Sequence, residues 1–259
     1  MTTSNKLGWR LAAQAWSFHH FTLFEAIDKT AALGLKYIEA YPGQALSPVE
    51  PETVFDPNLD AAGLEKTKAK LRSAGISLVN FGVVNLPNNE MESRKVFEFA
   101  KEMGIETIVS EPPLDAFDLL DRLCADYAIN VAIHNHPAPS PYWNPDTVLA
   151  ACKGRSARIG ACADTGHWVR SGIDPLEAMR KLEGRIISFH SKDVDVHSPE
   201  AQDVPWGTGI GDMKGQLEEI RRQGIKPVIS IEYELPTNAD PQCDMAKCIA
   251  YYESVCGTL

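Results

Sequence analysis

The sequence lacks the features of several large classes of protein. Its 259 residues include 35 acidic and 25 basic side chains, a formal charge of −10, and no run of Lys and Arg. Nucleic-acid-binding surfaces need clustered positive charge, so we expect no nucleic-acid partner. No apolar stretch is long enough to span a bilayer, and we expect no membrane partner. The opening MTTSNKLGWR contains no apolar core, which predicts no signal peptide and a cytoplasmic location.

Paired cysteines are also missing. The six cysteines are scattered and form no C-x-x-C pair, so the sequence predicts neither a disulfide framework nor a zinc knuckle. Cys162 falls in an apolar segment, and we expect it in the core.

What the chain does contain is a regular alternation of two kinds of segment. Short apolar runs, typical of buried strands, occur at 11–18, 37–41, 76–84, 106–111, 131–136, 159–164, 186–190 and 228–234. Between them, most segments place apolar residues at helical spacing and end on Gly, and a last helix is expected over 244–256. Eight such units predict a parallel (β/α)8 TIM barrel that forms one domain over 1–259. An open doubly wound sheet would have a Gly-rich turn after its first strand, and residues 16–22 contain no glycine.

Polar residues gather where the predicted strands end. In a TIM barrel, the catalytic residues lie at these C-terminal ends. Four of the seven histidines occur there. The strand ends carry Glu39, Glu111, His134, His136, Asp164, His167, His190, Lys192, Glu232 and Glu234.

Four of these residues form a candidate metal site. Strands five to eight present one each, at matching height: His134, Asp164, His190 and Glu232. Two imidazoles and two carboxylates suit a borderline divalent cation. Each residue also has a simpler interpretation, since Asp164 can cap the following helix and a single strand-end histidine can be hydrogen-bonded structure. The convergence of four such residues favours the metal.

The motifs CADTGHW, FHSKD, PWGTGIGD and ISIEYE, in this order, resemble the xylose-isomerase-like sugar isomerase/epimerase superfamily of TIM barrels. The resemblance covers essentially the whole chain. It implies metal ligation by Asp164, His190 and Glu232. It also implies one divalent cation, with Mn²⁺ as the first choice and Co²⁺, Zn²⁺ or Mg²⁺ as alternatives.

His134 departs from the family pattern, because the fourth ligand is typically a Glu in an L-E-N-H setting. Ketose 3-epimerases of the family use two metal-bound glutamates as opposed bases, so the resemblance leans toward the inosose dehydratase branch, which has a His-rich fifth strand. We also expect Gly166 to let the chain turn sharply and bring His167 back over the site.

A cation that holds two oxygens of a sugar makes the neighbouring C–H acidic, and a general base can then remove the proton. The candidate acids and bases are Glu232, His167, Lys192, His136 and Glu39. Lys192 can instead form a salt bridge with Asp193 or another carboxylate, and His136 can support a neighbour. The expected substrate contacts are Glu39, Trp16, Phe18, Asn135, Trp143 and Trp206. The loop 197–212 is expected to form a lid or a wall over the site.

These features predict a metal-dependent sugar isomerase or epimerase that acts on a small sugar or keto-sugar, with a homo-oligomer expected from the family. The alternative is a lyase, dehydratase or hydratase acting on a 3-keto sugar or inosose. A non-catalytic sugar-binding barrel is a more remote interpretation. The abasic-site endonucleases share the barrel, but they need more metal ligands than converge here, and the charge of −10 opposes DNA binding.

Overall fold

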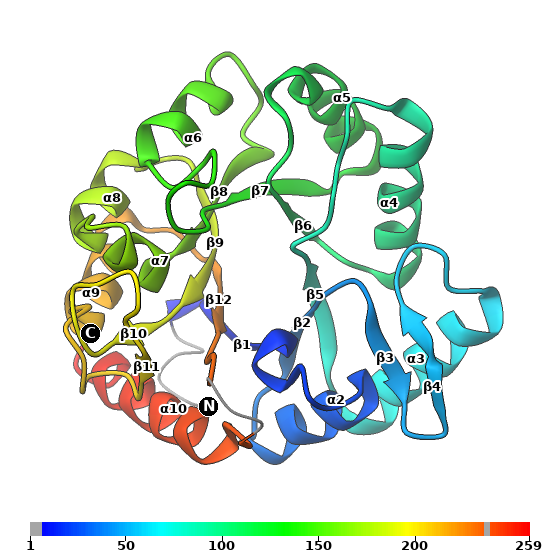
Figure 1. Ribbon diagram of the computed structural model, residues 1–259, viewed down its shortest axis with the longest axis horizontal. Coiled ribbons are helices and arrows are strands. Elements are labelled where there is room, and N and C mark those ends of the chain that lie inside the picture. The colour runs from blue at the N-terminus through cyan, green and yellow to red at the C-terminus, as the bar shows by residue number, and fades with distance from the viewer. Residues whose placement is uncertain (1–6, 236–238) are drawn as a thin grey trace.

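Eight parallel strands close into a barrel in the computed structural model, which describes residues 7–235 and 239–259. Neighbouring strands follow the order β1-β12-β9-β8-β7-β6-β5-β2. Figure 1 shows these strands around the centre, with helices forming the outer ring. The barrel strands are β1 (Arg10–Gln14), β2 (Tyr37–Ala40), β5 (Ser77–Phe81), β6 (Thr107–Ser110), β7 (Asn130–His134), β8 (Ile159–Asp164), β9 (Ile186–Ser191) and β12 (Val228–Ile231). The predicted (β/α)8 TIM barrel is confirmed.

Helices connect the strands at nearly every step. They are α2 (Leu23–Ala32), α3 (Ala61–Ala74), α4 (Glu90–Met103), α5 (Phe117–Tyr127), α6 (Pro145–Cys152), α7 (Thr165–Arg170), α8 (Pro175–Lys181), α9 (Met213–Gln223) and α10 (Gln242–Cys256). Two short 3-10 turns, η1 (Ala15–Phe18) and η2 (Leu114–Ala116), precede α2 and α5. Helix α2 begins with a reciprocal cap, in which the side chains of Thr22 and Glu25 each accept the backbone N–H of the other residue.

Several predicted strands end earlier in the structure, among them the first and the last. The first was expected over 11–18, but β1 ends at Gln14 because the Gln14 side chain accepts the N–H of Trp16 at 2.9 Å and starts η1. The last was expected over 228–234, but β12 ends at Ile231, so Glu232 directly follows the strand.

Two small hairpins were not predicted. One is formed by β3 (Gln44–Ser47) and β4 (Glu50–Phe55), between β2 and α3. The other is formed by β10 (Asp193–Val194) and β11 (Asp203–Val204), within the long loop after β9. Both are antiparallel additions outside the barrel (Figure 1).

Small apolar residues fill the inside of the barrel below the site. Val109, Ala132 and Cys162 pack together from three adjacent strands. Side chains two apart on a strand share a face, so His134 and Asp164 lie above this layer on the inner face. Cys162 is fully buried, as expected, and all six cysteines are free thiols. Within residues 7–235 and 239–259, no helix combines the length and apolar character needed to cross a bilayer.

Candidate functional site

The four expected metal ligands meet at the C-terminal end of the barrel. His134 ends β7 and Asp164 ends β8. His190 lies within β9, and Glu232 directly follows β12. One nitrogen or oxygen atom of each lies within 4.8 Å of the corresponding atoms of the other three, and all four side chains are buried. The structure therefore brings the predicted donor set together.

The four residues occupy different register positions on their strands. Asp164 pairs with His190 across β8 and β9. His134 instead pairs with Cys162, two residues before Asp164. Barrel strands are tilted against the barrel axis, and this tilt brings residues from different register positions to one point.

Each of the two histidines has its other ring nitrogen on a carboxylate. Nε2 of His190 lies 2.7 Å from Oε1 of Glu39, and Nδ1 of His134 lies 3.4 Å from Oε1 of Glu111. Such carboxylates fix the tautomer and orientation of metal-binding histidines. The other nitrogen of His190, Nδ1, has no hydrogen-bond partner in the described chain and lies 3.0 Å from Oε2 of Glu232. A buried imidazole nitrogen left free beside carboxylates fits a divalent cation.

Glu39 lies beneath the site rather than in it. Its side chain is fully buried, and besides His190 it bonds Asn80 at 3.2 Å and Ser230 at 2.6 Å. Glu39 was expected to contact substrate or act as an acid or base. Because its oxygens are engaged inside the barrel, we leave it out of the proposed substrate contacts and assign it the support of His190.

Asp164 is fixed through both its side chain and its backbone. Oδ1 of Asp164 accepts the N–H of His167 at 2.8 Å and so caps α7. The Asn135 side chain donates to the carbonyl of Asp164 at 2.9 Å and accepts its N–H at 2.8 Å. Asp164 therefore serves both as a helix cap and as a member of the cluster. Asn135, expected to contact substrate, is instead engaged in holding Asp164.

Gly166 does not make the sharp turn that we expected, and a close contact explains the glycine instead. It lies within α7, where the backbone is helical. A Cβ on Gly166 would lie 2.6 Å from Cβ of Lys192. The missing side chain allows α7 to approach the segment that carries Lys192.

Lys192 lies between the two acidic members of the cluster. Its Nζ is 2.5 Å from Oδ2 of Asp164 and 2.5 Å from Oε2 of Glu232, and its side chain is fully buried. Burial lowers the pKa of Lys192, but these carboxylates outweigh it and hold that pKa well above the ordinary value. Burial likewise raises the pKa of both carboxylates, yet Lys192 and the neighbouring imidazoles hold each below its usual range. The salt-bridge interpretation of Lys192 is thus realised, with these two carboxylates rather than Asp193.

His136 lies at the edge of the site, with 48% of its side chain exposed. Its Nδ1 is 2.6 Å from Oε1 of Glu111, which also accepts its backbone N–H at 2.9 Å. Burial lowers the pKa of His136, but the bond and charge of Glu111 more than reverse this and raise it. Glu111, which the sequence placed at a strand end, therefore positions two histidines.

A cavity of about 420 Å³ opens above the cluster and has two unlike sides. Its volume is within the usual range of small-molecule sites. The later strands line it with imidazoles and carboxylates, including His167 and Glu234. The segments at and after the ends of β1, β2 and β5 contribute Gln14, Trp16, Tyr41, Pro42, Gly82 and Val83.

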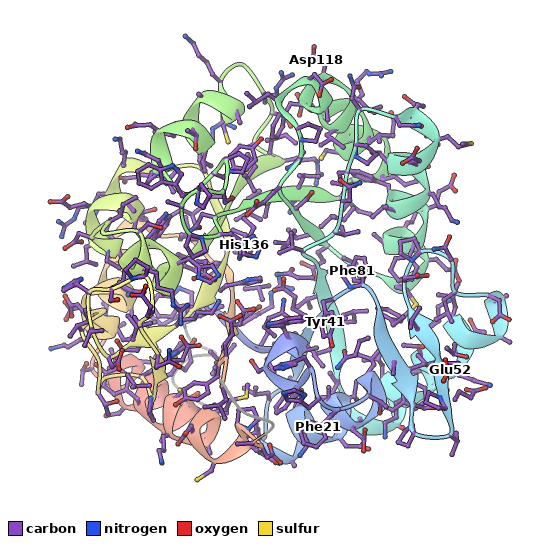
Figure 2. All side chains as sticks on the ribbon, viewed as in Figure 1. Phe21, Tyr41, Glu52, Phe81, Asp118 and His136 are labelled. Carbon is purple, nitrogen blue, oxygen red and sulfur yellow. The ribbon has the colours of Figure 1, made fainter. Side chains whose placement is uncertain are left out.

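Trp16 lies at the mouth of this cavity, as expected of a substrate contact. It is 41% exposed, its Nε1 donates to Oε1 of Glu234 at 3.1 Å, and its ring meets that of Tyr41 edge-on at 5.0 Å. Figure 2 shows Tyr41 and His136 near the middle of the barrel. Sequence reasoning did not single out Gln14 or Tyr41. Tyr41 ends the expected strand 37–41, and this position could have identified it, whereas the expected strand 11–18 extended past Gln14.

Three other expected aromatic contacts do not line the cavity. Phe18 and Trp206 are buried, and Trp206 packs edge-on against Tyr252. Trp143 lies in the loop before α6. None of the residues 197–212 lines the cavity either, so this loop is not its wall.

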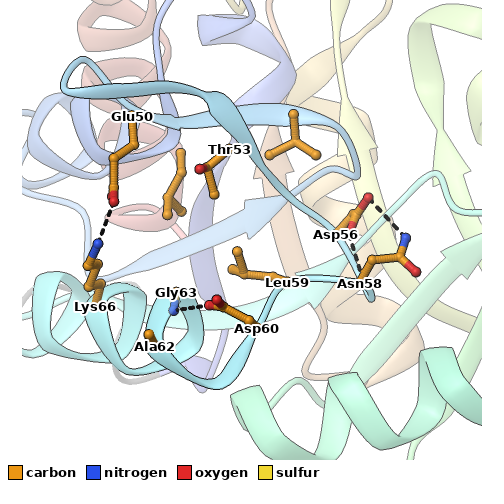
Figure 3. A pocket seen from close by; sticks show the side chains of 11 residues that line it. Glu50, Thr53, Asp56, Asn58, Leu59, Asp60, Ala62, Gly63 and Lys66 are labelled. Atoms are coloured by element: carbon orange, nitrogen blue, oxygen red, sulfur yellow. Dashed lines mark hydrogen bonds and ion pairs between the residues drawn. The ribbon is translucent and has the colours of Figure 1, made fainter.

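Figure 3 shows a second hollow, of about 350 Å³, beside α3 and the β3–β4 hairpin. Its charged groups are engaged with one another. Asp60 accepts the N–H of Gly63, Asp56 accepts that of Asn58, and Glu50 pairs with Lys66. No candidate metal cluster of the described residues lies there, so the chemistry points to the barrel mouth.

The chain matches the family described as xylose isomerase-like TIM barrels over residues 27–252. It belongs to this family. A solved structure of an uncharacterized protein from Parabacteroides distasonis ATCC 8503 is 36% identical, with a TM-score of 0.76, and the match covers 95% of this chain and 99% of that one. No protein with a curated description matches.

Two further solved structures share the fold at lower identity. A D-psicose 3-epimerase, solved in the presence of D-fructose, is 14% identical with a TM-score of 0.74, covering 96% of this chain and 99% of that one. The IOLI protein, solved with a zinc atom, is 15% identical with a TM-score of 0.74, covering 96% and 98%. Likeness at this level establishes the common fold.

Proposed function

We propose that the protein is a divalent-metal-dependent isomerase or epimerase of a small, unphosphorylated keto-sugar. The observation that carries this proposal is the buried cluster of His134, Asp164, His190 and Glu232, of which the two histidines and Glu232 line the cavity. Two structural relatives support it: a D-psicose 3-epimerase solved in the presence of D-fructose, and the IOLI protein solved with a zinc atom.

The cluster would hold the cation through two imidazoles and two carboxylates. Bound there, a divalent cation would polarise a carbonyl oxygen of the sugar and acidify the neighbouring C–H. The two nitrogen donors favour Mn²⁺, Zn²⁺ or Co²⁺ over Mg²⁺.

Glu232 is the base that we propose for removing the proton. Its carboxylate lines the cavity, and Lys192 at 2.5 Å keeps it ionised. Glu232 can return this proton to the neighbouring carbon, and the ammonium group of Lys192 stabilises the carboxylate that is left. General acid–base groups of this kind contribute about 100- to 10,000-fold to rate.

The lining favours an uncharged sugar. Within the described residues, no Arg or Lys lines the cavity, and Lys192 is enclosed between Asp164 and Glu232. A phosphate group needs cationic or clustered N–H donors. The half formed by Trp16 and Tyr41 instead offers aromatic surface for the apolar face of a sugar ring.

Elimination of a β-oxygen is the second candidate, and His134 and His136 favour it. With His134 in the fourth ligand position, Glu232 is the single carboxylate base of the cluster that lines the cavity. His136, whose pKa is raised by Glu111 against the effect of burial, can give a proton to a leaving oxygen. This chemistry would act on a 3-keto sugar or an inosose.

Proton NMR in D2O with the Mn²⁺-reconstituted and desalted protein tests both candidates. The substrates are ketohexoses, 3-keto-glucosides and inosose, and His134→Ala is the control. Deuterium at a carbon next to the carbonyl, with an isomeric product, supports the isomerase or epimerase. Loss of water or aglycone with an enone signal supports elimination. No exchange on any substrate contradicts both and favours a sugar-binding barrel.

A further inference from the structure

His167 turns its Nδ1 toward an arginine on its own helix. Nη1 of Arg170 lies 3.2 Å from Nδ1 of His167. A guanidinium has only N–H donors and stays charged, so Nδ1 is the acceptor in this bond. A neutral imidazole carries one proton, and with Nδ1 accepting, that proton is on Nε2.

Arg170 is clamped in this position. Its Nη2 lies 2.6 Å from Oδ1 of Asp203, its Nε donates to the carbonyl of Ala201 at 3.1 Å, and its Nη1 lies 3.7 Å from Oε2 of Glu234. Asp203 is itself fixed, because its Oδ2 accepts the backbone N–H of Glu234 at 2.7 Å. The loop after β9 and the segment after β12 thus hold the guanidinium against α7.

The other nitrogen of His167 faces the cavity. His167 is one of the lining residues, and its Nε2 lies 3.5 Å from Oδ2 of Asp164. Among residues 7–235 and 239–259, Nε2 makes no hydrogen bond. An N–H at this nitrogen is therefore available to a ligand in the cavity.

The same geometry decides how the histidine cluster is used. Atoms of His134, His136 and His167 lie close enough together to hold a second cation. A ligand nitrogen must offer a free lone pair. His167 has none to offer, because Nδ1 accepts from Arg170 and Nε2 carries the proton.

We propose that Arg170 is a positioning residue that fixes His167 as an Nε2–H donor to an acceptor oxygen of the substrate. The assignment of this oxygen to a keto-sugar rests on the proposed function. The tautomer of His167 and its cause are independent of that function. A donor fixed in advance in a buried site stabilises an oxygen that gains negative charge as the neighbouring proton is removed. The site would therefore select sugars that present a carbonyl oxygen to His167.

The tautomer can be read directly from long-range ¹H–¹⁵N NMR spectra of the histidine-labelled protein. The His167 signals are assigned by their loss in His167→Gln. We expect an unprotonated Nδ1 and a protonated Nε2, both without metal and with Zn²⁺, which is diamagnetic. On adding Zn²⁺, the signals of His134 and His190 should shift, while His167 keeps its Nε2 proton. A protonated Nδ1, or loss of the Nε2 proton on adding Zn²⁺, overturns the inference.

The role of Arg170 is tested by removing its charge. In Arg170→Met, we expect the His167 signals to move toward a mixture of the two tautomers. If Arg170→Met does not fold, the double variant Arg170→Met and Asp203→Asn replaces it in the same measurement. The second substitution removes the carboxylate that would otherwise be left buried without its arginine. Arg222→Met removes an exposed arginine that pairs with Glu183, and it should leave the His167 signals unchanged. An unchanged tautomer in both Arg170 variants overturns the positioning role.

Activity provides the second readout. With a substrate from the deuterium experiment, Arg170→Met should lower kcat at least tenfold and change KM less, and Arg170→Lys should restore part of the loss. Equal loss in Arg170→Met and Arg222→Met contradicts the proposal. If no substrate exchanges deuterium, the proposed function fails while the tautomer measurement still decides the role of Arg170.

Discussion

At the scale of single residues, the site depends on carboxylates that lie behind its histidines. Glu111 accepts from His136 and contacts His134. Glu39 lies beneath His190 and contacts its Nε2. Replacing such a partner is expected to change the histidine without removing it.

Glu111→Gln should lower the pKa of His136. In the native protein, burial lowers the pKa of His136, but the hydrogen bond and charge of Glu111 raise it overall. The stabilisation from this pair is therefore present below about pH 6.5 and lost as the pH rises through the higher pKa of the folded state. Without the carboxylate, burial dominates, and the pKa should fall below about 6.5. An NMR titration of the ring protons in metal-free protein measures it. Glu106→Gln, just before β6, is the control, and an unchanged pKa would show that Glu111 does not hold the proton.

Lys192→Met should strengthen metal binding and weaken catalysis. The ammonium group competes with a cation for Asp164 and Glu232, so its removal should lower the Kd for Zn²⁺ in calorimetric titration. Deuterium exchange into the substrate should fall about 100-fold or more. Lys214→Met, which removes an exposed lysine beside Glu218, should change neither quantity. Weaker zinc binding in Lys192→Met would contradict this account.

The four metal-binding candidates could be predicted from the sequence because each lies at or next to the C-terminal end of a strand. Their supporting residues could not, since those contacts join distant parts of the chain. His190 and Glu39 are 151 residues apart, and no local pattern connects them. The sequence identified Glu39 as a strand-end residue. It did not show whether the side chain faces the cavity or the barrel interior, because that depends on hydrogen bonds to distant residues.

At the scale of elements, one carboxylate organises the loop after β9. Asp193 accepts the N–H groups of Gly207 at 2.9 Å, Gly209 at 3.0 Å and Gly211 at 2.9 Å. A Cβ on Gly209 would lie 2.3 Å from the carbonyl oxygen of Val194. This contact explains the glycine at position 209 of the PWGTGIGD motif, which the sequence showed only as a motif.

Asp193→Asn should lower the free energy of unfolding by about 3 kcal/mol. In the native protein, both oxygens of the charged carboxylate accept backbone N–H groups. An amide replaces one of these oxygens with an NH2 group, which cannot accept them. Urea unfolding measures the change. Asp195→Asn, on the same hairpin but exposed, should stay within about 0.5 kcal/mol of the native protein. Equal effects at the two positions would remove the distinction between the buried carboxylate and the exposed one.

The β3–β4 hairpin shows why some elements escaped prediction. Its strands cover four and six residues, and Pro48 and Pro51 interrupt the apolar pattern. Periodicity identifies elements that extend over several turns or alternations. An inserted hairpin this short takes its stability from packing against α2, which a local pattern does not reveal.

At the scale of the whole molecule, metal binding and folding are coupled. The cluster draws on four strands, so a cation held there stabilises the closed barrel over the unfolded chain. At a free Zn²⁺ concentration 100 times the Kd, the free energy of unfolding should rise by about 2.7 kcal/mol, and a chelator should reverse the gain. Thermal unfolding detects it as a higher Tm. His190→Ala should abolish the increment, and the exposed His197→Ala should retain it. Stabilisation that survives His190→Ala would place the cation elsewhere.

The division of the cavity between two halves of the chain has an evolutionary consequence. The side chains with acid–base and metal-binding character come from β7 onward, whereas Trp16, Tyr41 and Val83 come from the first part of the barrel. Mutations in that first part can reshape the wall while the reactive groups stay in place. Homologues that act on different substrates should therefore differ mainly at the ends of β1, β2 and β5. The residues that carry out the reaction, on the later strands and at Glu39 beneath them, should stay the same.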